Sequence, residues 1–163
     1  MRYQMRQKIF SFGDDYAVLD EAGNEAFYID GRAFSFGKKL SVLDANRNEV
    51  AFIEQKLFSW GPTYEIYRGE DLAAVVKKEL FTFLSCKFTV DVPGPNDLEA
   101  KGSFTDMEYT FSRGRGPVAT VSKRWFALSD TYGIDIADGE DDALIVASAV
   151  VIDLVCHGDN KRH

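Results

Sequence analysis

Polar and apolar residues alternate over short stretches in the first half of the chain, which is the pattern of β-strands. In Phe10-Ser11-Phe12 the two aromatic side chains share one face of an extended chain and the serine occupies the other, as the strand period of two requires. Gly13 follows at once, and glycine accepts the backbone conformation that a tight turn needs. The same reasoning predicts strands at 16–20 and 26–29, with a turn at 21–24 between them.

This two-stranded unit recurs every 24 residues. The tetrad Phe-Ser-aromatic-Gly occurs at 10–13, 34–37 and 58–61, and a weaker copy, Leu-Phe-Thr-Phe, follows at 80–83. The first two units share ten of their 24 positions. Leucine-rich repeats and propeller blades do not fit this pattern, whereas successive hairpins make an antiparallel sheet that closes to remove its edges. We therefore expect a barrel in which the tetrad serines face outward. The residues expected to face inward are Phe10, Phe12, Phe34, Phe36, Phe58 and Trp60.

A second pattern, at residues 143–155, predicts a helix. These 13 residues are apolar except for Ser148 and Asp153, and they show no polar face. Acidic residues at 138–142 suit the start of a helix, and His157-Gly158 suit its end. A membrane span needs about 20 apolar residues, and no turn divides the run into the two buried strands that are the main alternative. A helix that is apolar all round must be buried on every side, so we expect it to fill the barrel.

Composition narrows the class of protein. A length of 163 residues predicts one domain over residues 1–163, with the Pro- and Gly-containing stretch 92–97 as an internal loop. The net charge of −7 argues against a nucleic-acid-binding protein. Two cysteines, Cys86 and Cys156, predict reduced buried thiols rather than a disulfide framework. The first residues lack the apolar core of a signal peptide, so we expect a cytoplasmic protein.

The order of several motifs resembles the bacterial branch of the LURP-one-related proteins, a family of the tubby C-terminal-like superfamily, to which the phospholipid scramblases also belong. The motifs span nearly the whole chain and run from Lys8-Ile9-Phe10-Ser11-Phe12 through Glu54-Gln55-Lys56-Leu57-Phe58-Ser59 and Val118-Ala119-Thr120-Val121-Ser122-Lys123 to Ala143-Leu144-Ile145-Val146-Ala147. The resemblance implies a closed antiparallel barrel of about twelve strands around a buried C-terminal helix. It also implies contact with lipid or a protein partner, and it supplies no catalytic motif.

The residues themselves give no strong indication of catalysis. Nucleophilic catalysis needs a base beside the nucleophile, yet the two histidines, His157 and His163, follow the predicted helix. Cys156-His157 has no partners at a zinc-binding spacing, and the acidic run before the helix lacks the spacing of a calcium loop. We expect no catalytic site, metal or cofactor. Asp153 must find hydrogen-bond donors if it is buried, and we expect an arginine or backbone N–H groups to supply them.

The clearest indication of function is a group of cations. No acidic residue lies between Glu108 and Asp130, but Arg113, Arg115, Lys123 and Arg124 do, and Trp125-Phe126 follow. Cations beside aromatic side chains suit anionic lipid headgroups or an acidic partner. The alternative is a solvated barrel rim with Trp125 packed inside. A hairpin of 109–112 with 118–123 would place Arg113 and Arg115 in its turn and the other two cations at its far end.

These observations favour a non-enzymatic interaction module that contacts anionic membrane lipid or a protein partner through rim loops, at the cytoplasmic side and peripheral to the membrane. The alternative is a small-molecule carrier or enzyme with a pocket at the barrel mouth, since barrels often hold ligands.

Overall fold

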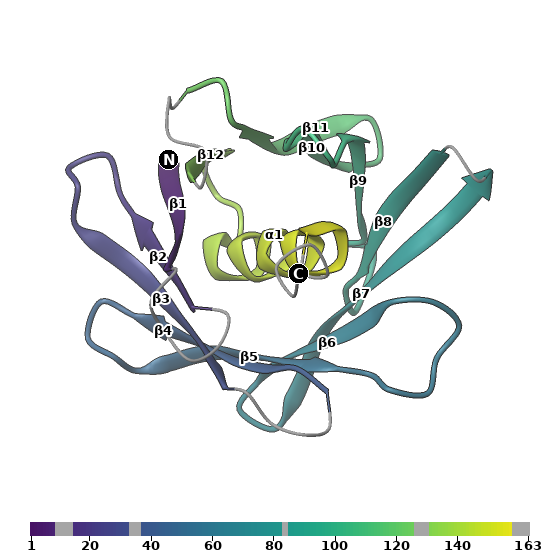
Figure 1. Cartoon of the computed structure of the whole chain (residues 1–163), viewed down its shortest axis with the longest axis horizontal. Helices are drawn as coiled ribbons and strands as arrows, with labels where there is room; N and C mark the ends of the chain where they lie inside the picture. Colours follow the sequence, from purple (N-terminus) through teal and green to yellow (C-terminus); the bar gives the residue numbers. More distant parts are fainter. Residues whose placement is uncertain (9–14, 33–36, 83–84, 126–130, 158–163) are drawn as a thin grey trace.

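The described residues form a closed antiparallel barrel of twelve strands with one helix inside it (Figure 1). A computed structural model describes residues 1–8, 15–32, 37–82, 85–125 and 131–157. The strands are β1 (Arg2–Lys8), β2 (Asp15–Leu19), β3 (Glu25–Arg32), β4 (Lys39–Asp44), β5 (Glu49–Gln55), β6 (Thr63–Arg68), β7 (Asp71–Thr82), β8 (Ser85–Asp91), β9 (Leu98–Ser103), β10 (Glu108–Arg113), β11 (Gly116–Ser122) and β12 (Thr131–Ile136). Each strand pairs with its neighbours in sequence, and β1 closes the ring by pairing with β12.

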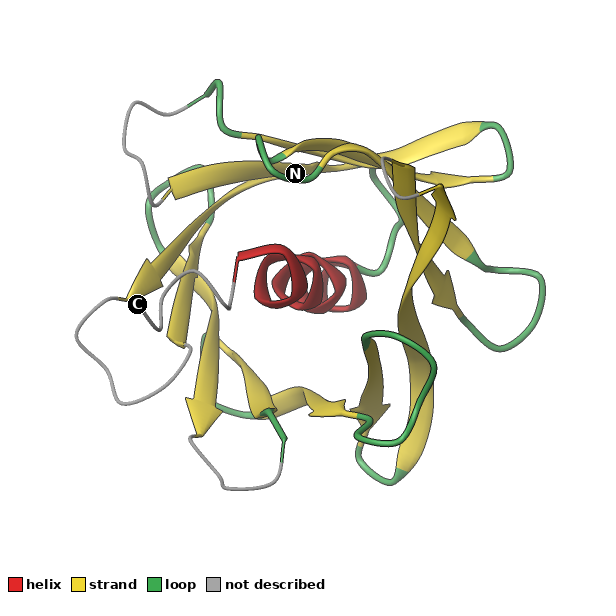
Figure 2. Ribbon diagram, turned by 45° about the vertical axis from the view of Figure 1, so that its right-hand side comes forward, coloured by secondary structure: helices red, strands yellow, loops and turns green. Residues whose placement is uncertain are grey.

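The helix α1 (Asp142–His157) lies along the inside of the ring, as the sequence predicts (Figure 2). Every residue from Leu144 to Leu154 is buried, because a helix without a polar face has no side to give to water. The Asp141 carboxylate caps its start by accepting a hydrogen bond of 3.2 Å from the Leu144 N–H. The helix ends at His157, which confirms both predicted boundaries to within two residues.

The repeat is visible in the wall as two equivalent hairpins, β2–β3 and β4–β5. In the first, Asp20 Oδ1 accepts hydrogen bonds from the N–H groups of Ala22 and Asn24, at 3.0 and 2.9 Å. In the second, Asp44 Oδ1 does the same for Asn46 and Asn48, both at 2.9 Å. Such side-chain bonds to the following backbone stabilise tight turns. The shared aspartate and asparagine of the repeat thus specify the turn between the two strands.

The prediction for the third tetrad is wrong. Residues 58–61 lie in the connection between β5 and β6, not in a strand, and Phe58 and Trp60 are 96% and 102% exposed instead of facing inward. Ser59 turns back to the loop's own backbone, where its hydroxyl donates to Gly61 O at 3.0 Å. The physical reason is the turn that Gly61-Pro62 enforces, with Gly61 at a φ of 78°. Phe10, Phe12, Phe34 and Phe36 lie outside the described residues.

The inward positions are instead filled by the strand residues themselves. The largest fully buried side chains of the wall include Tyr16, Phe88, Phe111, Met5, Ile53 and Ile66. They pack with the helix in one hydrophobic core. At twelve strands a barrel is too wide for its own side chains to fill, since about eight strands already reach that limit. The helix therefore completes a core that the wall cannot complete alone.

The two ends of the barrel differ in chemistry. We call the end where α1 begins the acidic end. The connections that lie there, with their flanking strand residues, span 19–25, 44–49, 68–71, 91–98, 113–116 and 136–142. All of them except 113–116 contain more acidic than basic residues. We call the end where α1 finishes the aromatic end. Its described connection residues span 37–39, 55–63, 103–108 and 122–125. They include the exposed side chains of Leu57, Phe58 and Trp60.

Substitution of Gly102 tests the register of the wall. An alanine Cβ at this position would lie 2.5 Å from Glu108 O and 2.6 Å from Tyr109 Cα, at a φ of 146°. Because backbone atoms cannot move away cheaply, we expect Gly102→Ala to lower the free energy of unfolding by at least about 2 kcal/mol. Urea denaturation measures this loss.

The matched control is Gly116→Ala. A Cβ there meets nothing closer than Arg113 O at 3.7 Å. We expect a change of less than about 0.5 kcal/mol. Equal stability of the two variants would contradict the pairing of β9 with β10.

Candidate functional site

The structure confirms the predicted hairpin, which is formed by β10 and β11. The four cations lie at the two ends of this hairpin. The strands pair from Tyr109 with Val121 to Arg113 with Gly116, and residues 114–115 form the turn. Arg113 and Arg115 therefore lie at the acidic end, whereas Lys123 and Arg124 follow β11 at the aromatic end. Seven strand residues separate the two pairs, which corresponds to about 26 Å along the strand from Arg115 to Lys123. The four cations form two separate pairs and not one patch.

Arg113 is engaged by the segment that leads into the helix. Its two terminal nitrogens donate to the two carboxylate oxygens of Glu140, at 2.9 and 3.1 Å. These hydrogen bonds raise the pKa of the Arg113 guanidinium. Arg68 pairs with Asp141, and the Tyr3 hydroxyl donates to Asp142 at 2.5 Å. Three strands thus hold the acidic segment in place, and the guanidinium of Arg113 serves that attachment.

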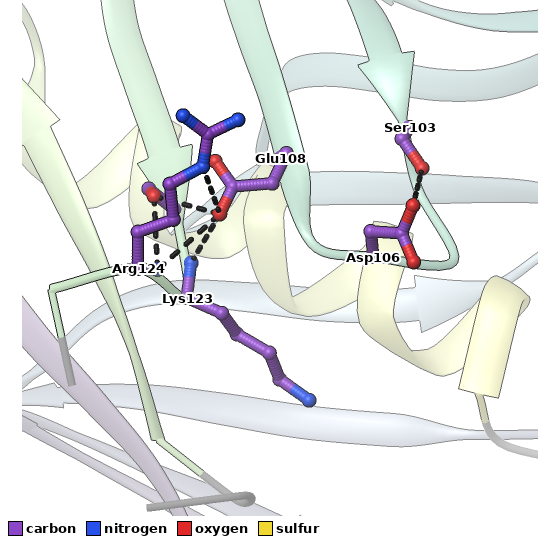
Figure 3. Close-up of polar contacts among 6 residues, drawn as sticks. Ser103, Asp106, Glu108, Lys123 and Arg124 are labelled. Carbon is purple, nitrogen blue, oxygen red and sulfur yellow. Dashed lines mark hydrogen bonds and ion pairs between the residues drawn. The ribbon is translucent and has the colours of Figure 1, made fainter. Parts of the chain in front are cut away.

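At the aromatic end, Glu108 holds the chain that follows β11 (Figure 3). Its Oε1 accepts hydrogen bonds from Ser122 Oγ at 2.8 Å and from the N–H groups of Lys123 and Arg124 at 3.1 and 3.3 Å. The Arg124 guanidinium lies 3.7 Å from the same oxygen, although its side chain is 83% exposed. Within the described part of the chain, no carboxylate forms an ion pair with Lys123. Figure 3 shows its side chain extending away from Glu108.

Trp125 is partly buried and lies in the turn that follows β11. The guanidinium carbon of Arg2 lies 4.1 Å from the centre of the Trp125 ring, which is the geometry of a cation–π contact. Trp125 is not among the side chains that pack in the core, so the alternative in which it packs inside the barrel is wrong. Phe126 lies outside the described residues.

The aromatic residues that sequence reasoning misplaced are the exposed ones. Leu57, Phe58 and Trp60 lie together on the loop between β5 and β6, which is on the opposite side of the ring from β11 and β12. Lys56 precedes them and is exposed. The dipeptide Gly61-Pro62 could have indicated that the third tetrad lies in a loop. It marks a turn directly after this tetrad and is absent from the other copies.

Buried polar groups gather inside the barrel near the end of the helix. The Tyr16 hydroxyl donates to the Asp153 carboxylate at 2.6 Å, so the partner of Asp153 is a tyrosine and not the expected arginine or backbone. Tyr132 donates to Met5 Sδ at 2.7 Å. The hydroxyl of Tyr109 is buried without a partner among the described residues.

The last residues of the helix lie next to these buried polar groups. His157 Nε2 lies 3.0 Å from Phe104 O and so joins the helix end to the turn between β9 and β10. Cys156, next to His157 in the helix, is partly buried. Nowhere in the described ranges do three or more His, Cys, Asp or Glu residues form a group that could hold a metal ion. None of the described helices has the length and apolar character needed to cross a membrane.

The geometry defines a class of protein: a closed twelve-stranded barrel whose own helix occupies the space where other barrels bind ligands. The comparisons agree with this class. Residues 1–153 match the family described as LURP-one-related, and the chain belongs to this family. The uncharacterised protein YxjI of Bacillus subtilis (strain 168) is 36% identical over 158 residues, which cover 97% of this chain and 95% of that protein.

A solved structure shares the fold. The crystal structure of the Arabidopsis thaliana protein AT5G01750 matches with a TM-score of 0.68 and 17% sequence identity, over 93% of this chain and 90% of that one. At this level of identity the likeness concerns the fold alone.

Removal of the hydroxyl group should affect the stability of the fold differently at two buried tyrosines. Tyr16→Phe removes the hydroxyl that donates to Asp153, and we expect it to lower the free energy of unfolding by about 1–3 kcal/mol. Tyr109→Phe removes a buried hydroxyl that has no partner among the described residues, so we expect no loss and a gain of up to about 1 kcal/mol. Thermal and urea denaturation measure both changes. Equal losses in the two variants would contradict the assignment.

Alkaline pH provides a separate test. Burial, with Asp153 next, raises the pKa of both Tyr109 and Tyr132 well above the ordinary value of 10.0. Their neutral forms therefore stabilise the fold fully below pH 10, and this stability is lost as the pH rises above that value. Each tyrosine adds a slope of up to about 1.4 kcal/mol per pH unit. Urea denaturation between pH 8 and 11 should show a shallower decline for Tyr132→Phe than for the parent protein.

Proposed function

We propose that this protein is a non-enzymatic interaction module that attaches to anionic membrane surfaces with its aromatic end. The observation behind the proposal is the separation of charge between the two ends of the barrel. Acidic connections surround the start of the helix, whereas Lys56, Lys123 and Arg124 lie at the other end. A molecule with this charge distribution turns its aromatic end, which carries these cations, toward a negative surface.

The two acidic residues in the connections described above for the aromatic end, Asp106 and Glu108, do not oppose this orientation strongly. Glu108 accepts hydrogen bonds from the backbone of Lys123 and Arg124, and Asp106 accepts one from Ser103 at 2.7 Å. Both carboxylates are therefore used within the barrel. Arg113 and Arg115 lie at the acidic end and are not part of the proposed surface, so the proposal keeps two of the four cations that the sequence indicated.

Two further features support a module rather than a carrier or an enzyme. The helix occupies the axis of the barrel with buried residues from Leu144 to Leu154, which is the space that a carrier would need. The buried carboxylate of the helix, Asp153, accepts a hydrogen bond from Tyr16 of the wall. Such a protein would act at the cytoplasmic face of a membrane, without spanning it.

Vesicle sedimentation tests the proposal. We expect the protein to bind vesicles that contain phosphatidylglycerol at low salt, and to be released by added salt. Lys123→Glu and Arg124→Glu should each weaken binding at least about fivefold, because each basic residue near the surface contributes about 1 kcal/mol and reversal adds repulsion.

Arg115→Glu is the matched control. It makes the same change of charge on an exposed side chain at the acidic end, and binding should change less than about twofold. The proposal fails if the parent protein ignores anionic vesicles, or if all three reversals weaken binding equally. Binding that persists in purely phosphatidylcholine vesicles would also contradict it.

A further inference from the structure

We propose that the loop between β5 and β6 is a membrane anchor, with Phe58 and Trp60 entering the interfacial layer of an anionic phospholipid bilayer. This inference rests on the proposed function and adds to it the part of the protein that enters the membrane. It begins from exposure. The residues Phe58 and Trp60 are 96% and 102% exposed, and Leu57 beside them is half exposed.

Exposed side chains of this size on one short loop are unusual. Scattered surface leucines need no explanation, but a contiguous apolar group marks a contact surface. Tryptophan in particular favours the boundary between lipid and water, where its ring is buried and its N–H remains hydrated. The loop contains no acidic residue between Gln55 and Tyr64, and its one charge is the cation of Lys56.

The loop is held in the conformation that displays these rings. Ser59 separates the two aromatic residues in sequence. Its hydroxyl points to the backbone of the loop, at 3.0 Å from Gly61 O and 3.4 Å from Lys56 O. The base of the loop is closed by a hydrogen bond of 2.9 Å from the Lys56 N–H to Thr63 O. A loop that is already ordered loses less conformational entropy when it binds.

Two neighbours fix the loop on the wall. Pro62 O accepts a hydrogen bond of 3.2 Å from the Lys78 N–H of β7. Leu57 lies against Gly37, where a Cβ would come within 3.0 Å of Leu57 Cδ2. Leu57 therefore supports the loop from the side, and the two aromatic rings are left to project from it.

Charge decides between a membrane and a second copy of this chain as the occupant. The loop lies at the aromatic end with Lys56, Lys123 and Arg124, while the acidic connections lie at the opposite end. Two copies that met through their aromatic ends would bring like charges together. An anionic bilayer instead attracts this end and offers an apolar layer to the rings.

Tryptophan fluorescence tests the inference directly, because the chain contains only Trp60 and Trp125. The Trp125→Phe variant reports on Trp60 alone. With vesicles of equimolar phosphatidylcholine and phosphatidylglycerol, we expect its emission to shift to the blue. We also expect quenching by lipids brominated near the top of the acyl chain, and protection from acrylamide in the water.

Removal of the rings tests their share of the binding. We expect Phe58→Ser with Trp60→Ser to weaken vesicle binding at least about tenfold, without a change in unfolding, since neither ring packs in the core. Leu72→Ser is the matched control. Leu72 is a large apolar residue at the acidic end, 44% exposed, and its loss should change binding less than about twofold.

The outcomes separate the anchor from the proposed function. Vesicle binding with unshifted Trp60 emission would overturn the anchor and leave electrostatic attachment intact. Absence of any binding would overturn both. A blue shift without vesicles that grows with protein concentration, together with a dimeric mass in light scattering, would assign the loop to a second copy of the chain and overturn the anchor.

Discussion

The structure depends on the mutual burial of an apolar helix and a wide barrel. Helix α1 has no face suited to water, and every residue from Leu144 to Leu154 is buried. The twelve-stranded wall encloses more space than its own side chains can fill. Without the other part, each would expose its apolar surface to water. Even the one carboxylate of the buried stretch, Asp153, is accommodated by a wall residue, since Tyr16 donates to it.

Closure of the wall also determines where the protein can meet partners. A closed ring has no free edge for strand addition, so contact is left to the outer wall and to the two ends. The ends differ because successive connections alternate between them, and the acidic and basic residues are distributed unequally over the two sets. Arg113 illustrates the difference, since it lies close to Lys123 in sequence yet serves the attachment of the helix at the opposite end.

Much of the fold follows from the sequence, and the exceptions have physical reasons. The helix and the hairpins were predicted because their apolar periods are long or repeated, although the number of strands came from the family resemblance. The third tetrad was misplaced because alternation cannot distinguish a strand from an ordered loop whose serine bonds to its own backbone. Tyr16 and Asp153 are 137 positions apart, and no local pattern indicates which residues face each other across a barrel. The candidate site was found only in part. The hairpin pattern already indicated that the four cations divide between two ends, whereas the strand period placed Phe58 and Trp60 on the inside instead of at the surface.

The pairing of β1 with β12 has a consequence for biosynthesis. Met5 pairs with Tyr132, and the helix that fills the interior follows all twelve strands along the chain. A ribosome therefore releases the whole wall before the segment that it encloses. Contacts of such long sequence separation form slowly, and an incomplete wall exposes unpaired strands and apolar surface in the meantime. The wall can close around α1 only after residue 157 has left the ribosome, so chaperones have access to the strands throughout the synthesis of this domain.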